Sequence, residues 1–353
     1  MEKDNKIYIQ QPFREQYTLT IASEVNAVSA LIISTVELRY DFQVLDIRDD
    51  HIEVRLLMLD NRIVKANNPM VKEVAQVSQV FGRMYNELHL NLSPKGKVLK
   101  VLNTDLILSK WGETKTEMQK YISGNPELEQ AMSLNDTIFN SPEKVKVAVQ
   151  ANEFFQVYFG QIFEEIIPRA KKISGTNIFN TANLEWNINI DEMVSKSTEE
   201  KICISSDANP VRPFSPGYLN AAYHQFKEQL EINPLHVKMF QSEERVIERN
   251  TGKLDEAIIK KVEEVEPKKL YQKFTYKMIS DTEKKLQQEK LNSSKAKEAT
   301  PDITPEIVRE NAKPEIYKVV EGKEFTLEEW KIYEERQWKI HQEKKKKKGF
   351  FGF

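Results

Sequence analysis

The residues best suited to bind another molecule gather at the C-terminal end of the sequence. Five consecutive lysines, residues 344–348, precede a short segment that holds three phenylalanines. A row of ammonium groups beside aromatic rings suits a surface with an apolar centre and an acidic rim. The residues expected to bind a partner are Trp330, Trp338, Lys344, Lys345, Lys346, Lys347, Lys348, Phe350, Phe351 and Phe353. The sequence therefore predicts a C-terminal binding segment.

The composition of this C-terminal segment leaves three functions open. Its phenylalanines can enter a groove of a partner protein while the lysines contact an acidic rim. They can also insert into a membrane interface, with the lysines next to anionic head groups. The segment can equally be a solubilising tail. We expect a protein partner first and an anionic membrane surface second. Nucleic acid is not expected, because the basic run is short and the rest of the sequence has no basic stripe interleaved with aromatic residues.

Patterns typical of metal binding and catalysis do not occur in the sequence. The five histidines stand far apart and Cys203 is the only cysteine, so zinc spacings are missing. Cys203 lies in a strand-like run, which favours a small buried hydrophobe over a nucleophile. Asp46, Asp49 and Asp50 beside His51 could serve a cation or acid–base chemistry, yet hairpin turns favour aspartate anyway. We therefore expect no catalytic residue, no metal, no cofactor and no enzymatic activity.

The overall composition predicts a soluble chain with a very polar surface. The 353 residues carry a formal net charge of -2, so no overall field attracts nucleic acid or anionic lipid. Mean hydropathy is -0.57, and no stretch approaches the about 20 apolar residues that span a bilayer. The first residues hold no apolar run typical of a secretory signal, and a single cysteine fits a reducing compartment. We therefore expect a cytoplasmic protein.

Two long alternating stretches must organise the fold around them. Ala30 to Ile47 and Ile52 to Lys65 read as strands joined by the turn at Asp49 to His51. In the second stretch apolar residues share one parity and charged residues the other, which is the pattern of a strand with one buried face. A hairpin of this length must lay its apolar face against other elements. The sequence therefore predicts a large antiparallel sheet.

A helix is expected directly after this hairpin. Asn68 and Pro69 are typical of a helix start, and apolar residues then recur at helical spacing up to Leu88. If this helix covers the sheet, its apolar face can enclose a small molecule between the two. The ligand-binding residues expected for that alternative function are Val77, Phe81 and Met84.

The rest of the chain divides by composition. Helices are expected over most of residues 103–163 and at 216–231, and further strands in the segments 177–194, 201–205, 237–249, 254–265 and 270–278. After Ser280 the sequence becomes rich in Lys, Glu, Gln, Ser and Ala. We therefore expect a curved-sheet domain at 1–280, a charged linker at 281–313, and a C-terminal helix with its polylysine and aromatic terminus at 314–353.

Two short segments resemble a known architecture. Ile162 to Pro168, followed by Ile173 to Thr176, is one, and Glu248 to Leu254 is the other. They are similar to segments of bacterial half-barrel proteins of uncharacterised function, related in architecture to lipoprotein-carrier domains. The resemblance implies a curved antiparallel sheet with helices across its concave side over residues 1–280. Those proteins are usually exported and often lipidated, whereas this sequence shows neither a leader nor a lipobox cysteine.

Together these observations predict an α+β fold with a curved, half-barrel-like antiparallel sheet packed with helices, and a C-terminal helical tail. The first functional hypothesis is a non-enzymatic binding or assembly protein, an adaptor or scaffold that engages a partner through its C-terminal segment. The alternative is a carrier that holds an apolar small molecule or lipid between the curved sheet and a covering helix. The oligomeric state is not indicated by the sequence.

Overall fold

The computed structural model describes residues 6–28, 30–122, 126–139, 141–226, 237–298, 318–320 and 323–325. The chain forms two compact units, residues 1–293 and 294–353. What is described of the second unit is a small hairpin of β12 (Lys318–Val320) and β13 (Lys323–Phe325). Trp330, Trp338 and the whole segment 344–353 lie outside the described residues. The C-terminal helix, the binding role of its residues and the domain boundaries at 280 and 313 therefore stay predictions.

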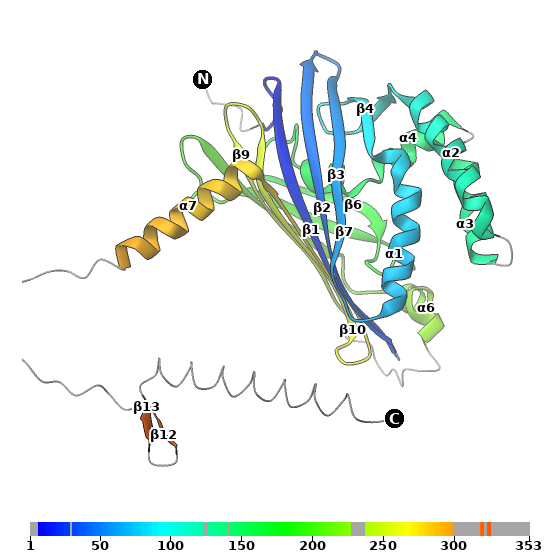
Figure 1. Cartoon of the computed structure of the whole chain (residues 1–353). Helices are drawn as coiled ribbons and strands as arrows, with labels where there is room; N and C mark the ends of the chain where they lie inside the picture. The colour runs from blue at the N-terminus through cyan, green and yellow to red at the C-terminus, as the bar shows by residue number, and fades with distance from the viewer. Residues whose placement is uncertain are drawn as a thin grey trace, which may run out of the picture. The chain divides into compact units, whose positions relative to one another are not determined.

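The first unit is built on one large antiparallel sheet that remains open. Its described part has eleven strands, and β5 and β6 form its two edges. From one edge to the other the strands are β5 (Val98–Val101), β4 (Glu87–Leu92), β3 (Ile52–Ala66), β2 (Ala30–Ile47), β1 (Phe13–Ala27), β11 (Leu270–Ser280), β10 (Leu254–Glu266), β9 (Lys238–Glu248), β8 (Lys201–Pro210), β7 (Asn183–Glu192) and β6 (Arg169–Thr176). The predicted α+β class with a curved open sheet is confirmed (Figure 1).

The two halves of the chain meet in the middle of this sheet. β1 pairs with β11, and Tyr17 lies opposite Ser280. β2 and β3 are the two stretches that the alternating pattern predicts, paired from Ile47–Ile52 towards Ser34–Ala66. Their register shifts at three places, and such bulges bend a strand pair and increase its twist. The curvature of the sheet is therefore built into its longest hairpin.

Seven α-helices occur among the described residues, most of them between β3 and β9. They are α1 (Pro69–Gly82), α2 (Thr104–Ile122), α3 (Pro126–Phe139), α4 (Pro142–Gln150), α5 (Glu153–Phe159), α6 (Pro216–Tyr223) and α7 (Asp281–Glu298). α1 packs on β3, whereas α2, α3 and α4 lie together beside the β4–β5 edge (Figure 1). None of the helices in the described ranges is both long and apolar enough to cross a bilayer.

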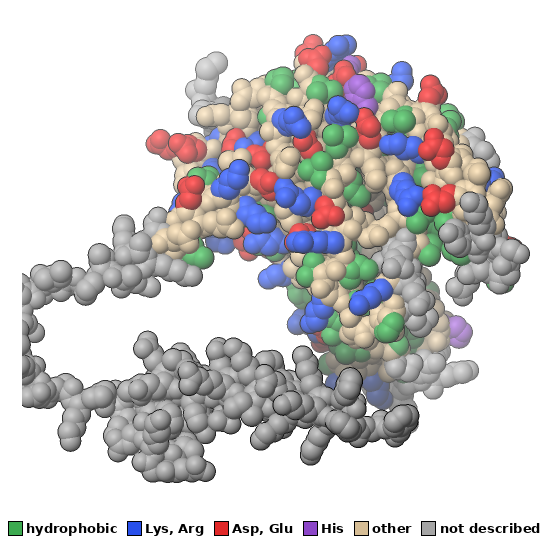
Figure 2. Space-filling view, viewed as in Figure 1, with side chains coloured by type: hydrophobic (Ala, Val, Ile, Leu, Met, Phe, Trp, Pro, Cys, Tyr) green, Lys and Arg blue, Asp and Glu red, His purple; other side chains and the backbone are tan. Residues whose placement is uncertain are grey.

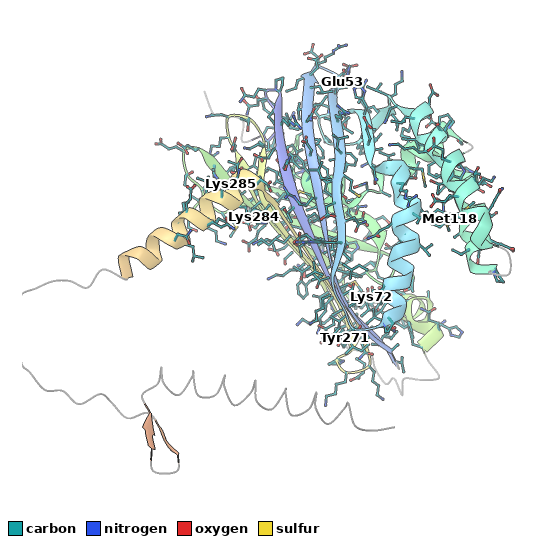
Figure 3. The ribbon with its side chains drawn as sticks, viewed as in Figure 1. Glu53, Lys72, Met118, Tyr271, Lys284 and Lys285 are labelled. Atoms are coloured by element: carbon teal, nitrogen blue, oxygen red, sulfur yellow. The ribbon has the colours of Figure 1, made fainter. Side chains whose placement is uncertain are left out.

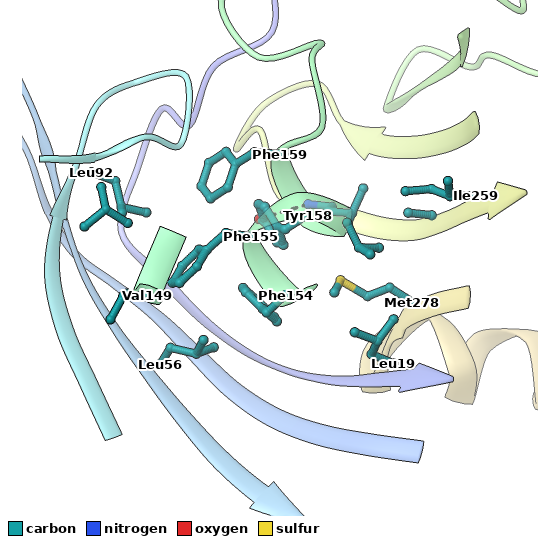
Figure 4. Packing of buried hydrophobic residues seen from close by; sticks show 14 of the residues in the cluster. Leu19, Leu56, Leu92, Val149, Phe154, Phe155, Tyr158, Phe159, Ile259 and Met278 are labelled. Atoms are coloured by element: carbon teal, nitrogen blue, oxygen red, sulfur yellow. Dashed lines mark hydrogen bonds between the residues drawn. The ribbon is translucent and has the colours of Figure 1, made fainter. Parts of the chain in front are cut away.

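Helix α5 fills the centre of the concave face of the sheet with aromatic side chains. Figure 4 shows Phe154 and Tyr158 among the buried side chains of the core. The ring of Phe42 on β2 lies 5.0 Å from each of these two rings, measured between centroids. The side chain of Asn152 caps the helix by accepting from the backbone N–H of Phe154 at 2.9 Å. Burying each aromatic side chain contributes about 1.5–3 kcal/mol. This short, capped and very apolar helix is therefore a major part of the core.

Helix α7 continues directly from β11 and is tied to the sheet by its first turn. Asp281 forms an ion pair with Arg39 at 2.6 Å, and Glu283 forms one with Lys201 at 2.7 Å. The side chains of residues 284–292 are exposed, among them Lys284, which Figure 3 labels. On the face of the molecule shown in Figure 2, basic and acidic side chains are interspersed.

Candidate binding groove

Helix α5 leaves part of the concave face uncovered, and two adjacent cavities lie there. The first has a volume of about 300 Å³ and reaches across strands β6 to β11. The second has a volume of about 260 Å³ and lies between α5 and strands β9 to β11. Four residues line both cavities, namely Gln161, Gln241, Lys261 and Tyr276. Because of this shared wall we treat the two cavities as one site, which we call the concave groove.

The lining of the first cavity combines apolar side chains with neutral polar ones such as Gln161, Asn180 and Gln241. Its apolar lining consists of Ile173, Ile178, Trp186, Ile188, Ala208, Phe274 and Tyr276. Trp186 is 7% exposed, and its indole Nε1–H donates to the carbonyl oxygen of Thr176 at 3.2 Å. Strand alternation places these side chains on one face, because residues two apart in a strand point the same way. The first cavity therefore presents a row of apolar side chains beside polar ones, with the Trp186 indole held by a hydrogen bond.

Lys261 carries the charge of the groove. It lies on β10 between two cross-strand neighbours, Gln241 on β9 and Phe274 on β11. Its Nζ stands 5.5 Å from the centroid of the Tyr276 ring, a cation–π contact. Burial lowers the pKa of Lys261, while the nearby Glu243 acts in the opposite direction. Within the ranges that the structure describes, no carboxylate forms an ion pair with this ammonium group.

The carboxylate nearest to Lys261 along the sheet is already neutralised. Glu243 forms a buried ion pair with Arg245 and accepts a hydrogen bond from the side-chain amide of Gln241. The Arg245 guanidinium also donates to the carbonyl oxygen of Val157, from Nε at 3.3 Å and from Nη2 at 3.2 Å. Arg245 therefore fixes the end of α5 on the sheet and compensates Glu243 at the same time.

A second buried carboxylate, Glu263, holds a loop that lines the groove. Glu263 is fully buried on β10 and accepts three hydrogen bonds. The donors are Asn177 Nδ2 at 2.9 Å, the backbone N–H of Phe179 at 2.9 Å and the hydroxyl of Tyr223 at 2.6 Å. These bonds join the loop after β6 and helix α6 to the sheet. Asn177 and Ile178 of that loop line the first cavity, so its wall is held in place.

Two other cavities differ from the groove in their charges. One, of about 440 Å³, lies beside residues 6–10, and the other, of about 490 Å³, lies between α1 and β3. The first contains Arg249, which is paired with Glu192 at 2.6 Å. The second contains Arg83, which is paired with Glu117 at 2.8 Å. These two arginines therefore form ion pairs with carboxylates of the chain itself, whereas Lys261 forms none among the described residues.

The three residues expected to bind a ligand lie on another part of the fold. The ring of Phe81 is 6.2 Å from Trp111 of α2, and Met84 is fully buried just after α1. Val77 is half-buried, and none of the three lines the concave groove. The structure thus places the side chains of Phe81 and Met84 among helices and core residues. Their role in ligand binding stays a prediction.

The other residues considered for chemistry have structural partners. Asp46 bonds to Arg48 at 2.9 Å, and Asp50 lies 2.7 Å from Nδ1 of His51. In the part of the chain that the structure describes, no three His, Cys, Asp or Glu side chains come together as a metal site. Cys203 is buried and donates to the carbonyl oxygen of Lys196, and burial raises the pKa of its thiol.

Lys261 is not among the site residues predicted from the sequence, although its position within a strand is a signal for it. Lys260 and Lys261 are consecutive in a strand, so their side chains point to opposite faces of the sheet. Lys261 has the parity of Ala257 and Ile259, which are both buried. A lysine in register with core residues is the pattern that could have marked a charge inside the sheet.

Comparison with known proteins gives little beyond this geometry. No known protein family and no curated protein matches the chain in sequence. Among solved structures, a lipovitellin chain, from a study of lipid–protein interactions in lipovitellin, matches with a TM-score of 0.35 and 6% identity. The match covers 76% of this chain and 25% of the lipovitellin chain, so the chain spans about a quarter of that protein. A similarity this low carries no conclusion about fold or function, and the half-barrel resemblance stays a prediction.

Proposed function

We propose that this protein is a non-enzymatic carrier that binds an apolar small molecule or lipid in the concave groove. The observation that supports this proposal most is the row of apolar side chains in the first cavity, which adjoins a second cavity lined by helix α5. Ligand pockets are typically apolar clefts of about 300–1,000 Å³ with a few polar groups. The two adjoining cavities, of about 300 and 260 Å³, fall in this range when taken together. The expected cytoplasmic location belongs to the same proposal.

Hydrogen bonds hold parts of the groove wall in place without a ligand. Trp186 is held by its hydrogen bond to Thr176, and the loop with Asn177 is held by Glu263. A pocket whose side chains are already fixed loses less entropy when a ligand enters. We therefore expect the groove to bind its ligand without a large change in the sheet.

A dye titration tests this function directly. A neutral naphthylamine dye, whose fluorescence rises in apolar surroundings, is titrated into the full chain and into two variants. Ile173→Trp fills the first cavity, because Ile173 lines it from the edge strand β6. Ser174→Trp is the matched control, since Ser174 is its exposed neighbour on the opposite face of the same strand. We expect Ile173→Trp to raise the dye Kd at least about tenfold and Ser174→Trp to leave it unchanged.

Two results would overturn the carrier function. One is a wild-type chain that does not bind the dye at all. The other is equal dye binding by both tryptophan variants, with both confirmed as folded by thermal unfolding. Extraction of the purified protein with organic solvent, followed by mass spectrometry, is a second measurement. We expect it to release an amphiphilic small molecule from the wild type and much less from Ile173→Trp.

The C-terminal segment supports a second candidate function, an adaptor or scaffold. The sequence observation that favours it is the run of five lysines, residues 344–348, next to Phe350, Phe351 and Phe353. Deletion of residues 349–353 should remove a defined protein partner in pull-down experiments without changing the thermal unfolding of the chain. Replacing Lys344 to Lys348 by glutamine separates the charge from the aromatic contribution. If neither change alters partners or membrane association, this function is excluded.

A further inference from the structure

The single positive charge in the first cavity lies among apolar and neutral polar side chains. Among the described residues that line this cavity, Lys261 is the one charged side chain, and no aspartate or glutamate is present. Lys261 also lines the second cavity, so its ammonium group lies where the two meet. The Lys260 side chain, one position earlier, is exposed on the other face of β10. A positive charge is therefore placed inside the groove and not only on the surface of the sheet.

None of the charged groups around Lys261 in the described residues forms an ion pair with it, although Glu243 acts on it from a distance. On β9, Glu243 and Arg245 form a pair with no net charge. On β10, Glu263 is occupied by three hydrogen-bond donors. On α5, Glu153 lines the second cavity together with Glu243 of β9, and within the described ranges it forms no ion pair with Lys261. A half-buried charge that lacks a partner is costly, and an anion from outside can supply the missing one.

We infer that the groove binds an anionic amphiphile, whose carboxylate or phosphate pairs with Lys261 while its apolar part lies on Trp186 and Ile188. This inference rests on the proposed carrier function and adds the class of ligand. A lysine ammonium is a compact point charge that accepts a carboxylate or a phosphate without demanding a planar partner. Gln161, which lines both cavities, adds a side-chain amide beside the same charge. The apolar body and the anionic head thus find separate, adjoining surfaces.

Competition against the neutral dye tests this inference. The competitors are dodecanoate, dodecyl phosphate and the neutral dodecanol, each used below the concentration at which it forms micelles. We expect the wild type to release the dye at about tenfold lower concentration of an anionic competitor than of dodecanol. Lys261→Met should abolish this preference, measured as the ratio of the two competitor concentrations in the same variant, and Lys261→Arg should retain it. The comparison of dodecanoate with dodecyl phosphate identifies which head group the site prefers.

The matched control is Lys260→Met, which removes the neighbouring charge from the opposite face of the same strand. It should keep the preference for anionic competitors. If dodecanol competes as well as dodecanoate in the wild type, the inference fails while the carrier function stands. The inference also fails if Lys260→Met loses the preference as Lys261→Met does, because the effect is then one of general surface charge. If the wild type does not bind the dye, the carrier function fails and the inference with it.

Discussion

Gly160 lies directly against the guanidinium group of Arg245. Its backbone has a positive φ of 53°, and its N–H donates to the carbonyl oxygen of Gln156 at 3.1 Å, which ends helix α5. A Cβ atom at this position would overlap the Arg245 side chain. Since Arg245 also pairs with Glu243 and donates to Val157, this close approach joins the end of α5 to β9. The edge of the groove depends on it.

Replacing this glycine should therefore destabilise the protein. Gly160→Ala places a side chain in a backbone conformation that favours glycine and displaces Arg245, and should cost about 1–3 kcal/mol of unfolding free energy. Gly112→Ala is the control, because Gly112 lies in α2 with no other atom within 4 Å of its missing Cβ. It should be neutral or stabilise by up to about 1 kcal/mol. Urea denaturation measures the unfolding free energy of both variants. An unfolding free energy of Gly160→Ala equal to that of the wild type would contradict the close contact between Gly160 and Arg245.

The buried carboxylate of Glu263 should be needed for the wall of the groove. In Glu263→Gln an amide NH₂ replaces one acceptor oxygen, and fewest hydrogen bonds are lost if it takes the place of Oε2, which accepts only from the backbone N–H of Phe179, whereas Oε1 accepts from Asn177 and Tyr223. We expect a loss of about 2 kcal/mol in unfolding free energy and about 1 kcal/mol for Tyr223→Phe. Hydrogen exchange should show a faster amide at Phe179 in Glu263→Gln. Native-like exchange at Phe179 in that variant would show that the carboxylate does not hold the loop.

Asp41 should give the stability of this protein a pH dependence. Burial alone would raise the pKa of Asp41, but hydrogen bonds from Arg14 and Gln43 outweigh burial and lower it. A carboxylate with a lowered pKa stabilises the folded state above its unfolded pKa of about 3.9, and this contribution is lost as the pH falls through the folded value. Asp41→Asn should therefore cost about 1 kcal/mol at neutral pH, and the difference from wild type should shrink below about pH 4.

The control for this pH dependence is Asp49→Asn, because Asp49 is exposed in the turn between β2 and β3. Its effect on unfolding free energy should stay within about 0.5 kcal/mol. Chemical denaturation at a series of pH values measures both variants. A destabilisation by Asp41→Asn that is the same at low and neutral pH would rule out the role assigned to the charge of Asp41.

The local pattern of the sequence predicts the fold class and its longest hairpin. Ala30–Ile47 and Ile52–Ala66 form the strands that alternation indicates, because a strand with one buried face has an apolar residue at every second position. The pairing of β1 with β11 in the middle of the sheet is different. Tyr17 and Ser280 pair although almost the whole sequence of the first unit lies between them, and no local sequence pattern encodes a contact between residues so far apart in the chain.

The candidate site could be predicted less well than the fold. The helical spacing of Phe81 and Met84 shows that one face is buried, but not whether it meets a ligand, the sheet or other helices. Trp111, whose ring contacts Phe81, belongs to helix α2, and strands β4 and β5 lie between α1 and α2 in the sequence. The parity of Lys261 with Ala257 and Ile259 indicates its inward position, but not the cavity around it, because α5 and β11 must first be in place to enclose that cavity.

The most direct test of the groove as a binding site is a crystal structure of the protein with dodecanoate that carries a bromine atom at its far end. Anomalous diffraction then locates the bromine independently of the chain. The account predicts a bromine peak in the first cavity over Trp186 and Ile188, with the carboxylate beside Nζ of Lys261. A bromine peak only in the cavity between α1 and β3, or only on the outer surface of the sheet, would contradict it.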